Sequence, residues 1–188
     1  MGAATVSGLL EQAALAVLIG WLAWALGGMA LSPVPATALG AAIGLGAVTV
    51  FAGTLPIAAL IALLAPFGVM LPALALRQVG AHLGLPVAPF STLELAAFLV
   101  AYLVFLAAAM GAVPVDLYRF GYAPLPVALM TLAVCAYGFA TGNLFLPLVA
   151  VAGQLAWALG WGSSNWFDHV LHVLLIPIVL TILAQRLI

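Results

Sequence analysis

The chain has 188 residues, of which 68% are hydrophobic and 4% are charged. Soluble globular domains carry about a quarter of their residues as charged groups, so this composition excludes a water-facing surface and indicates a lipid bilayer as the solvent. The formal net charge of −1 leaves no basic surface for nucleic acid or for clusters of anionic headgroups. We therefore expect lipid, and not nucleic acid, around the chain.

Six long apolar runs follow one another along the chain, bounded by proline, glycine and polar residues. A helix that crosses about 30 Å of hydrocarbon needs roughly 20 apolar residues, so each run predicts a membrane-spanning helix. The runs lie at 8–31, 37–64, 92–112, 124–141, 144–161 and 166–187. They are continuously apolar and do not alternate, which favours helices over strands.

A further segment, 66–80, is apolar but short, and Pro66 and Pro72 interrupt it. Such a segment forms either a distorted span or a part that enters the bilayer and returns. We predict an all-α, polytopic integral membrane helical bundle with six full transmembrane helices and one partial or re-entrant segment at 66–80, with seven spans as the alternative. The whole chain, 1–188, is expected to form a single transmembrane domain.

Small residues recur four positions apart in the first two runs, a spacing that lets two helices approach closely. The pairs are Ala23 and Gly27, Gly40 and Gly44, and Ala42 and Gly46. In a chain so rich in alanine and glycine, the same spacing also arises by chance.

The orientation of the chain in the membrane depends on Arg77, Arg119 and Arg186. With six spans, Arg77 and Arg186 fall on one side, and the positive-inside rule then predicts cytoplasmic amino and carboxyl termini. With seven spans, the side with two arginines becomes the one opposite the amino terminus.

Nearly all ionisable groups fall into two sets of loops. An even number of crossings separates the loop after 92–112 from the loop before 166–187, so these two loops share a face under either count. Their polar residues form the candidate polar site, which consists of Asp116, Arg119, Asn165, Asp168, His169 and His172. The second polar patch, expected on the opposite face, consists of Arg77, His82 and Glu94.

Helix capping explains several of these polar residues without a function. The sequence from Ser91 to Glu94 matches a capping box, in which the two side chains satisfy the first amides of a helix. Asn165 suits the N-cap of the last helix, which puts Asp168 at its third position. Glu11 similarly suits the start of the first helix, because a negative charge is favourable there.

Two histidines in the last run are less easily explained by capping. His169 and His172 are three residues apart, and Asp168 lies four before His172, so on one helix it would orient the ring. Pro177 removes a backbone donor and would free the carbonyl of Val173. The pattern matches no complete metal-ligand set, so we predict no metal site, although a single axial ligand to a haem or chlorophyll is an alternative.

Two further polar groups stand out. Asp116 and Arg119 are three apart, so on one helical turn they would form a local ion pair. Gln154 lies near the middle of its apolar run, where its amide needs a partner. We expect it to face the bundle and to bond a neighbouring helix or a solute.

Two hypotheses for the function stay open. The first is a small membrane protein that binds or transports a small apolar or weakly polar solute, or an ion, because ionisable groups in or near a bilayer are costly and often functional. The second is an accessory or scaffold subunit of a larger membrane complex, with partner membrane subunits and a tetrapyrrole or quinone site. No nucleophile elbow, phosphate-binding loop or zinc-protease motif occurs, so we do not expect an enzyme. The sequence identifies no cofactor.

Overall fold

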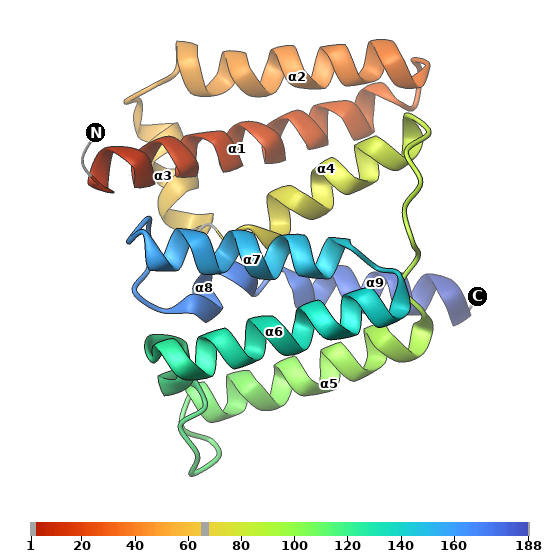
Figure 1. The fold of residues 1–188 in the computed structure, drawn as a ribbon. Helices are drawn as coiled ribbons and strands as arrows, with labels where there is room; N and C mark the ends of the chain where they lie inside the picture. The colour runs from red at the N-terminus through yellow and green to blue at the C-terminus, as the bar shows by residue number, and fades with distance from the viewer. Residues whose placement is uncertain (1–2, 65–67, 188) are drawn as a thin grey trace.

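All regular secondary structure in the described part of the chain is helical. The computed structural model describes residues 3–64 and 68–187, is 76% helical and has no strand in those residues. The elements in chain order are α1 (Ala3–Gly27), α2 (Pro33–Val50), α3 (Leu55–Leu64), α4 (Met70–His82), α5 (Thr92–Ala109), the 3-10 helix η1 (Tyr118–Tyr122), α6 (Pro124–Thr141), α7 (Phe145–Ala158), α8 (Trp166–Val170) and α9 (Leu175–Leu187) (Figure 1). The all-α prediction is confirmed.

The longer helices run roughly along a common direction. In Figure 1, α1 and α2 lie at one edge, α5 and α6 lie towards the opposite edge, and α4, α7 and α9 lie between them. The helix contacts agree, because α1 packs on α2 and α4, α6 packs on α7, and α5 packs on α9. The start of α1 and the end of α9 lie at opposite ends of this bundle (Figure 1), whereas six full spans would bring both termini to one face.

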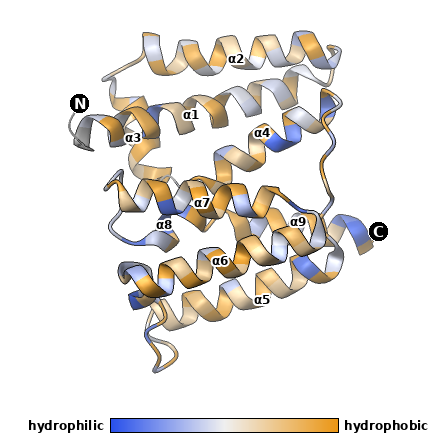
Figure 2. Cartoon of the chain, viewed as in Figure 1, coloured by the Kyte–Doolittle hydropathy of each residue, from blue (hydrophilic) through white to orange (hydrophobic). Residues whose placement is uncertain are grey.

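The outer surface of the bundle is apolar. Figure 2 shows hydrophobic residues along the lengths of the helices and hydrophilic residues mainly towards their ends. Leu26, Leu125 and Leu132 expose 70%, 70% and 65% of their surface. A protein in water rarely exposes such continuous apolar surface, so these faces suit contact with lipid chains.

Four helices are long and apolar enough to cross a membrane, namely α1, α2, α5 and α6. The helices α3, α7 and α9 are apolar but have 10 to 17 residues. The predicted run 124–141 matches α6 at both ends, but the count of six or seven full spans is not confirmed.

Two of the predicted runs are interrupted, and this is where the six-span prediction differs most from the structure. The run 37–64 is divided between α2 and α3 by a turn in which Gly53 has a φ of 72°. The run 166–187 is divided between α8 and α9, and Leu171 there is extended, with φ −120° and ψ 151°. Pro56 and Pro177 fall in the first turns of α3 and α9, where a missing N–H costs nothing.

The predicted partial segment 66–80 forms α4, which extends to His82. Pro66 lies outside the described residues. Pro72 does not interrupt the helix but stands in its first turn, where its fixed φ is compatible with helical geometry.

Glycines bring α1 and α2 into close backbone contact. Gly40 and Gly44 are buried on α2 in line with Ala36 and Val48, and a methyl group on Gly44 would overlap the carbonyl oxygen of Ala16 on α1. The predicted role of the Gly40 and Gly44 spacing is thus confirmed.

The other two predicted spacings have different outcomes, because one lies on the contact between α1 and α2 and the other does not. A methyl group on Gly46 would meet nothing within 4 Å and Ala42 is exposed, so the pairing of those two residues in a helix contact is wrong. Gly27 lies on the contact, because a methyl group there would be 3.3 Å from Leu39.

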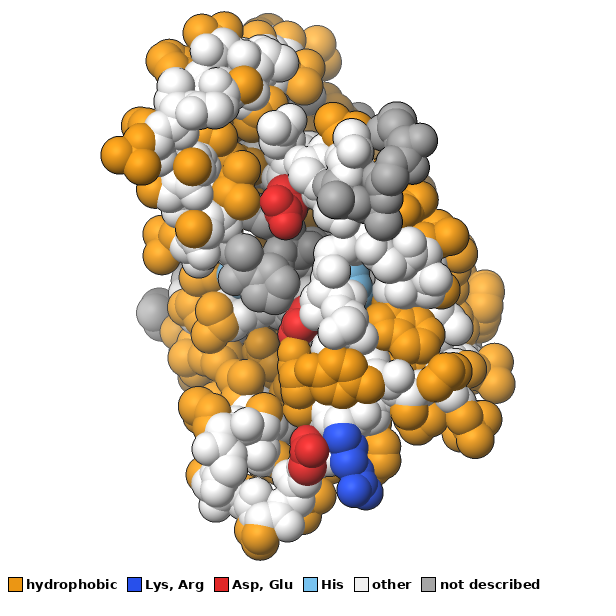
Figure 3. Space-filling view, turned by 90° about the vertical axis from the view of Figure 1, so that its left-hand side faces the viewer, with side chains coloured by type: hydrophobic (Ala, Val, Ile, Leu, Met, Phe, Trp, Pro, Cys, Tyr) orange, Lys and Arg blue, Asp and Glu red, His pale blue; other side chains and the backbone are white. Residues whose placement is uncertain are grey.

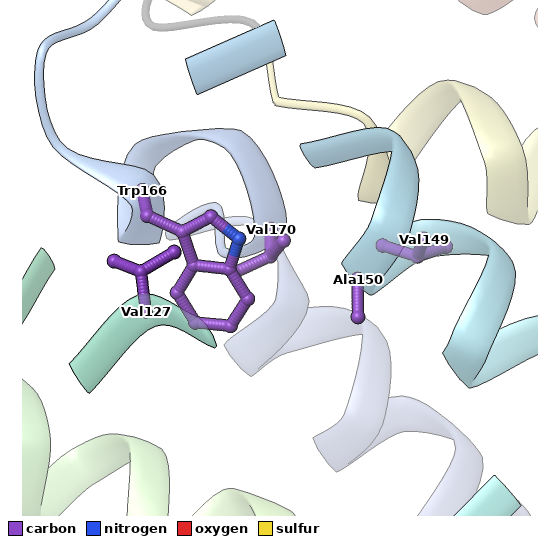
Figure 4. Packing of buried hydrophobic residues seen from close by; sticks show 5 residues of the cluster. All are labelled: Val127, Val149, Ala150, Trp166 and Val170. Carbon is purple, nitrogen blue, oxygen red and sulfur yellow. The ribbon is translucent and has the colours of Figure 1, made fainter. Parts of the chain in front are cut away.

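The core next to the loop after α7 holds α8 in place. Val127 of α6, Val149 and Ala150 of α7, and Trp166 and Val170 of α8 form one buried cluster. Figure 4 shows the Trp166 indole beside Val127, with Val170 on the same side of α8. This packing fixes a helix of only five residues, which would not be stable alone.

The glycine contact gives a test with opposite signs at neighbouring positions. Gly44→Ala should destabilise the protein by about 1–3 kcal/mol, because the methyl group forces α1 and α2 apart. Gly46→Ala should stabilise it by about 0.5–1 kcal/mol, because alanine restricts the unfolded chain and the position is open. Thermal unfolding in detergent measures both, and equal shifts for the two variants would contradict the contact.

Candidate functional site

The α3–α4 junction and the α8–α9 junction meet in the interior of the bundle. The backbone N–H of Val69 donates to the carbonyl of His169 at 2.5 Å, and Nε2 of His172 lies 3.0 Å from the carbonyl oxygen of Leu64. Gly68 permits this approach, because a methyl group there would lie 2.7 Å from the carbonyl oxygen of His169. The end of α3 and the start of α4 are therefore both joined directly to the segment around the end of α8.

Asn165 caps α8 and ties it to the preceding loop. Its Oδ1 accepts from the N–H of Phe167 at 2.9 Å, and its side-chain amide donates to the carbonyl of Tyr118 at 2.9 Å. The side chain is completely buried. A methyl group on Gly121 would overlap Oδ1, so η1 packs closely on the cap. The predicted N-cap is confirmed, and it also joins the two loops.

Asp168 is the third residue of α8, as predicted, but its carboxylate binds side chains instead of helix amides. The hydroxyl of Tyr118 donates to Oδ1 and Oδ2 at 2.7 and 2.8 Å. The hydroxyl of Ser163 donates to Oδ2 at 2.5 Å. Both donors are neutral hydroxyls, and no cationic side chain is among these contacts.

His169 is buried, with 3% of its surface exposed. Its Nε2 lies 2.9 Å from the carbonyl oxygen of Ser163 and must be the donor, because a carbonyl only accepts. Ser163 thus holds His169 through its carbonyl and Asp168 through its hydroxyl. Sequence reasoning did not single out this serine, since only the fold brings it between the two side chains.

His172 does not share a helix face with His169. The helix α8 ends at Val170, so the predicted orientation of the His172 ring by Asp168 is wrong. Nδ1 of His172 accepts from the N–H of Leu174 at 3.2 Å, which leaves Nε2 as the donor to the carbonyl of Leu64. The ring is therefore neutral, with both nitrogens engaged.

The expected free carbonyl of Val173 is also not found, because it accepts from the N–H of Ile176 at 3.1 Å. The break before α9 moves the effect of Pro177 to the first turn of a new helix. No open backbone site results, and no kink within a continuous helix forms.

A cavity of about 970 Å³ opens beside α8. Helices α1, α4 and α7 and the segment that leads into α8 form its wall, which is mostly aliphatic, aromatic or glycine. Its polar lining residues are Ser7, Glu11, Ser163, Asp168 and His169. Figure 3, which views this end of the molecule, shows separate acidic side chains on a largely apolar surface. We call this space the α8 cavity.

Glu11 belongs to this cavity and not to the start of a helix. Because α1 begins at Ala3, Glu11 lies in its third turn and is half-buried. The interpretation of Glu11 as a charge at the first helical turn is therefore wrong. The cavity brings it to the same space as Asp168, which lies 157 positions later in the chain.

Asp116 and Arg119 lie near the site but outside the α8 cavity. Asp116 accepts from the backbone N–H of Arg119 at 3.1 Å, and the guanidinium of Arg119 lies 5.1 Å from the ring centre of Phe120. Both residues are described and exposed, and their side chains form no ion pair, so that prediction is wrong. Water-exposed ion pairs contribute little, and the local capping bond of Asp116 competes with one.

Tyr118, between those two residues, is what joins this loop to α8. Burial and the hydrogen bond to Asp168 raise the pKa of Tyr118 above its ordinary value. Nothing in the sequence near Tyr118 indicates its carboxylate partner, which lies 50 residues later in the chain.

The second polar patch lies away from the α8 cavity, and the described contacts do not join its three members to one another. Glu94 forms the predicted capping box with Ser91, which is confirmed, and also accepts from the hydroxyl of Tyr137 at 2.5 Å. Arg77 donates to the carbonyl of Ala88. His82 is exposed.

His82 and Gln154 both lie outside the lining of the α8 cavity. Nδ1 of His82 lies 2.9 Å from the carbonyl oxygen of Gln78, and its ring packs edge-on against Trp24. Gln154 is half-buried on α7, and the expected hydrogen bond to a neighbouring helix is absent from the described part of the chain.

The side chains that could bind a metal ion lie apart from one another in the described structure. Residues 3–64 and 68–187 hold no group of three or more His, Cys, Asp or Glu side chains that could bind a metal ion. The two buried imidazoles, His169 and His172, use Nε2 for backbone carbonyls. Of their four ring nitrogens, Nδ1 of His169 has no protein partner among the described residues.

The environment of Tyr118 gives a pH-dependent prediction. An ordinary tyrosine ionises near pH 10, and the stabilisation from neutral Tyr118 is fully present below that pH. It is lost as the pH rises through the raised pKa, because the unfolded chain releases its proton first. The ultraviolet difference titration between wild type and Tyr118→Phe should show one phenol that ionises above pH 10. Ionisation at the ordinary pH would contradict its bond to Asp168.

Comparison of the chain with protein-family models, with curated proteins and with solved structures finds no match. No activity, ligand or partner is therefore carried over to this chain from a relative. The chemistry of the α8 cavity and the paired helix junctions is the basis for a proposed function.

Proposed function

We propose that the protein is a non-enzymatic membrane protein that binds a small organic cation, apolar apart from its charge, in the α8 cavity and transports it across the bilayer. The observation that carries this proposal is an apolar cavity lined by Glu11, Asp168 and His169, at the point where the start of α4 is bonded to α8.

The electrostatics of the cavity favour a positive solute. Glu11 and Asp168 both line it, whereas no arginine does within the described residues. Asp168 is held by two neutral hydroxyls, so its charge is available to a ligand. Both carboxylates are partly buried, and a charge removed from water is costly unless it is paired, so a cationic ligand offsets that cost. The apolar wall favours a solute with alkyl or aromatic surface over a hydrated metal ion.

The paired junctions support transport over simple binding. In many membrane transporters, two discontinuous helices meet at the substrate site, since unwound backbone is tolerated only where it lies in protein or lines a cavity. Here the α3–α4 and α8–α9 junctions meet, and Gly68, Val69 and His169 from them line the same cavity.

For the topology, we propose that α3 with α4 and α8 with α9 each make one crossing, which gives seven. Arg77 and Arg186 both bond the segment 88–90, so they lie at one end of the bundle. By the positive-inside rule that end is cytoplasmic, together with the carboxyl terminus. The amino terminus and Arg119 then lie on the other side.

The solute is tested by the binding of ethidium, a lipophilic cation, to the protein in lipid nanodiscs, followed by fluorescence. Glu11→Gln and Asp168→Asn should each weaken binding about tenfold, because each removes one carboxylate charge from the cavity. Asp116→Asn is the matched control, since this exposed acid lies at the same end but outside the cavity. Equal binding by all variants, or none by the wild type, would refute a cationic solute.

The alternative, an accessory subunit of a larger complex, is tested on the same preparation. Purification in mild detergent should yield a colourless protein without stoichiometric partners. Co-purification of a partner subunit, a tetrapyrrole or a quinone would favour the alternative.

Labelling of single cysteines in sealed vesicles distinguishes seven crossings from six. In a Cys135→Ala background, Ser32→Cys and Ser91→Cys should react with an impermeant maleimide from one side, and Ser164→Cys from the other. All three serines are exposed. With six spans, Ser91→Cys would instead react from the side opposite Ser32→Cys.

A further inference from the structure

A second cavity, of about 520 Å³, lies at the other end of the bundle from the α8 cavity. Helices α4, α5, α6, α7 and α9 contribute to its wall. Its wall is almost entirely apolar, with side chains that include Leu74, Phe98, Leu146, Leu175, Ile178 and Val179. The polar exceptions are Arg77, Glu94 and Tyr137, and none of them belongs to the site described above.

Arg77 is a cation with few partners. One terminal nitrogen donates to the carbonyl of Ala88, and the guanidinium carbon lies 4.7 Å and 5.2 Å from the ring centres of Phe90 and Phe145. A guanidinium has five N–H donors, so most of them stay open. Within the described residues the side chain forms no ion pair, although it is partly removed from solvent.

Glu94 lines the same cavity but does not pair with Arg77. Its Oε2 accepts from the backbone N–H of Ser91 at 2.6 Å and its Oε1 accepts from the hydroxyl of Tyr137 at 2.5 Å. The capping box fixes that carboxylate at the start of α5. The open hydrogen-bonding capacity of the cavity is therefore that of a donor with a positive charge.

We propose that this second cavity binds a long-chain carboxylic acid, with its alkyl chain among the apolar side chains and its carboxylate on Arg77. Arginine pairs with a carboxylate through two parallel N–H···O bonds, which suits the open edge of this guanidinium. The volume lies within the usual range for small-molecule sites, about 300–1,000 Å³.

The head group, and not the chain, must supply the selectivity. The surrounding lipid is as apolar as the cavity wall, so transfer of an alkyl chain from bilayer to cavity gains little. A carboxylate that meets Arg77 next to two aromatic rings gains a charge-assisted pair in a poorly hydrated setting. Amphiphiles of equal chain length but different head groups should therefore bind very differently.

The experiment follows displacement of spin-labelled stearic acid from the wild-type protein in zwitterionic nanodiscs by electron paramagnetic resonance. Oleate should displace the probe at concentrations at least tenfold lower than oleyl alcohol or oleylamine. Equal displacement by the alcohol or the amine would overturn the proposal without any variant. Retention of a two-chain phospholipid in the cavity, seen by native mass spectrometry, would also overturn it.

Variants of Arg77 test whether the carboxylate head group binds at this arginine. Arg77→Gln should weaken binding of spin-labelled stearic acid at least tenfold, and Arg77→Lys should fall between it and the wild type. Arg186→Gln is the matched control, because Arg186 lies at the same end but already bonds Thr92 and Phe90. Equal affinities of Arg77→Gln and Arg186→Gln would refute the assignment. If Arg77→Gln does not fold, the affinity of Arg77→Lys and the comparison of oleate with oleyl alcohol and oleylamine test the proposal instead.

Discussion

The need to pair backbone polar groups that lie away from water shapes this fold. An N–H or C=O that faces hydrocarbon without a partner costs several kcal/mol, so a break in a helix is tolerated only where something else supplies the bond. Here the end of α3 and the start of α4 exchange such bonds with the segment around the end of α8. The N–H of Val69 meets the carbonyl of His169, and the ring of His172 meets the carbonyl of Leu64. The position of α8, and with it the wall of the larger cavity, depends on this exchange.

Local signals in the sequence were sufficient where a helix end is determined by its own residues. The capping box of Ser91 and Glu94, the cap at Asn165 and the whole of α6 follow from such signals. The ends of α2 at Val50 and of α8 at Val170 could not be predicted from such signals. An apolar run has the same composition whether or not the helix within it is interrupted. Hydropathy indicates whether a segment is surrounded by apolar groups. The segments on both sides of such a break are equally apolar, so hydropathy does not locate the break.

The partners of the polar side chains could not be predicted either, for a different reason. Asp168 and Tyr118 are 50 residues apart, and no pattern in either loop encodes the contact. Glu11 was assigned to a helix start because a charge near an apparent boundary is common there. The fold also gives the two cavities different charges: two acids, Glu11 and Asp168, line the larger one, whereas Arg77 and Glu94 line the smaller one.

The glycine contact between α1 and α2 has a mechanical consequence. It makes these two helices one stiff unit, and Glu11 belongs to that unit, whereas Asp168 belongs to the unit built on α6, α7 and α8. Apart from α2, helix α1 packs mainly on α4. There the indole N–H of Trp21 donates to the side-chain oxygen of Gln78 at 2.9 Å. A small rotation of the α1–α2 unit about that contact would change the separation of the two carboxylates without breaking any hydrogen bond around α8.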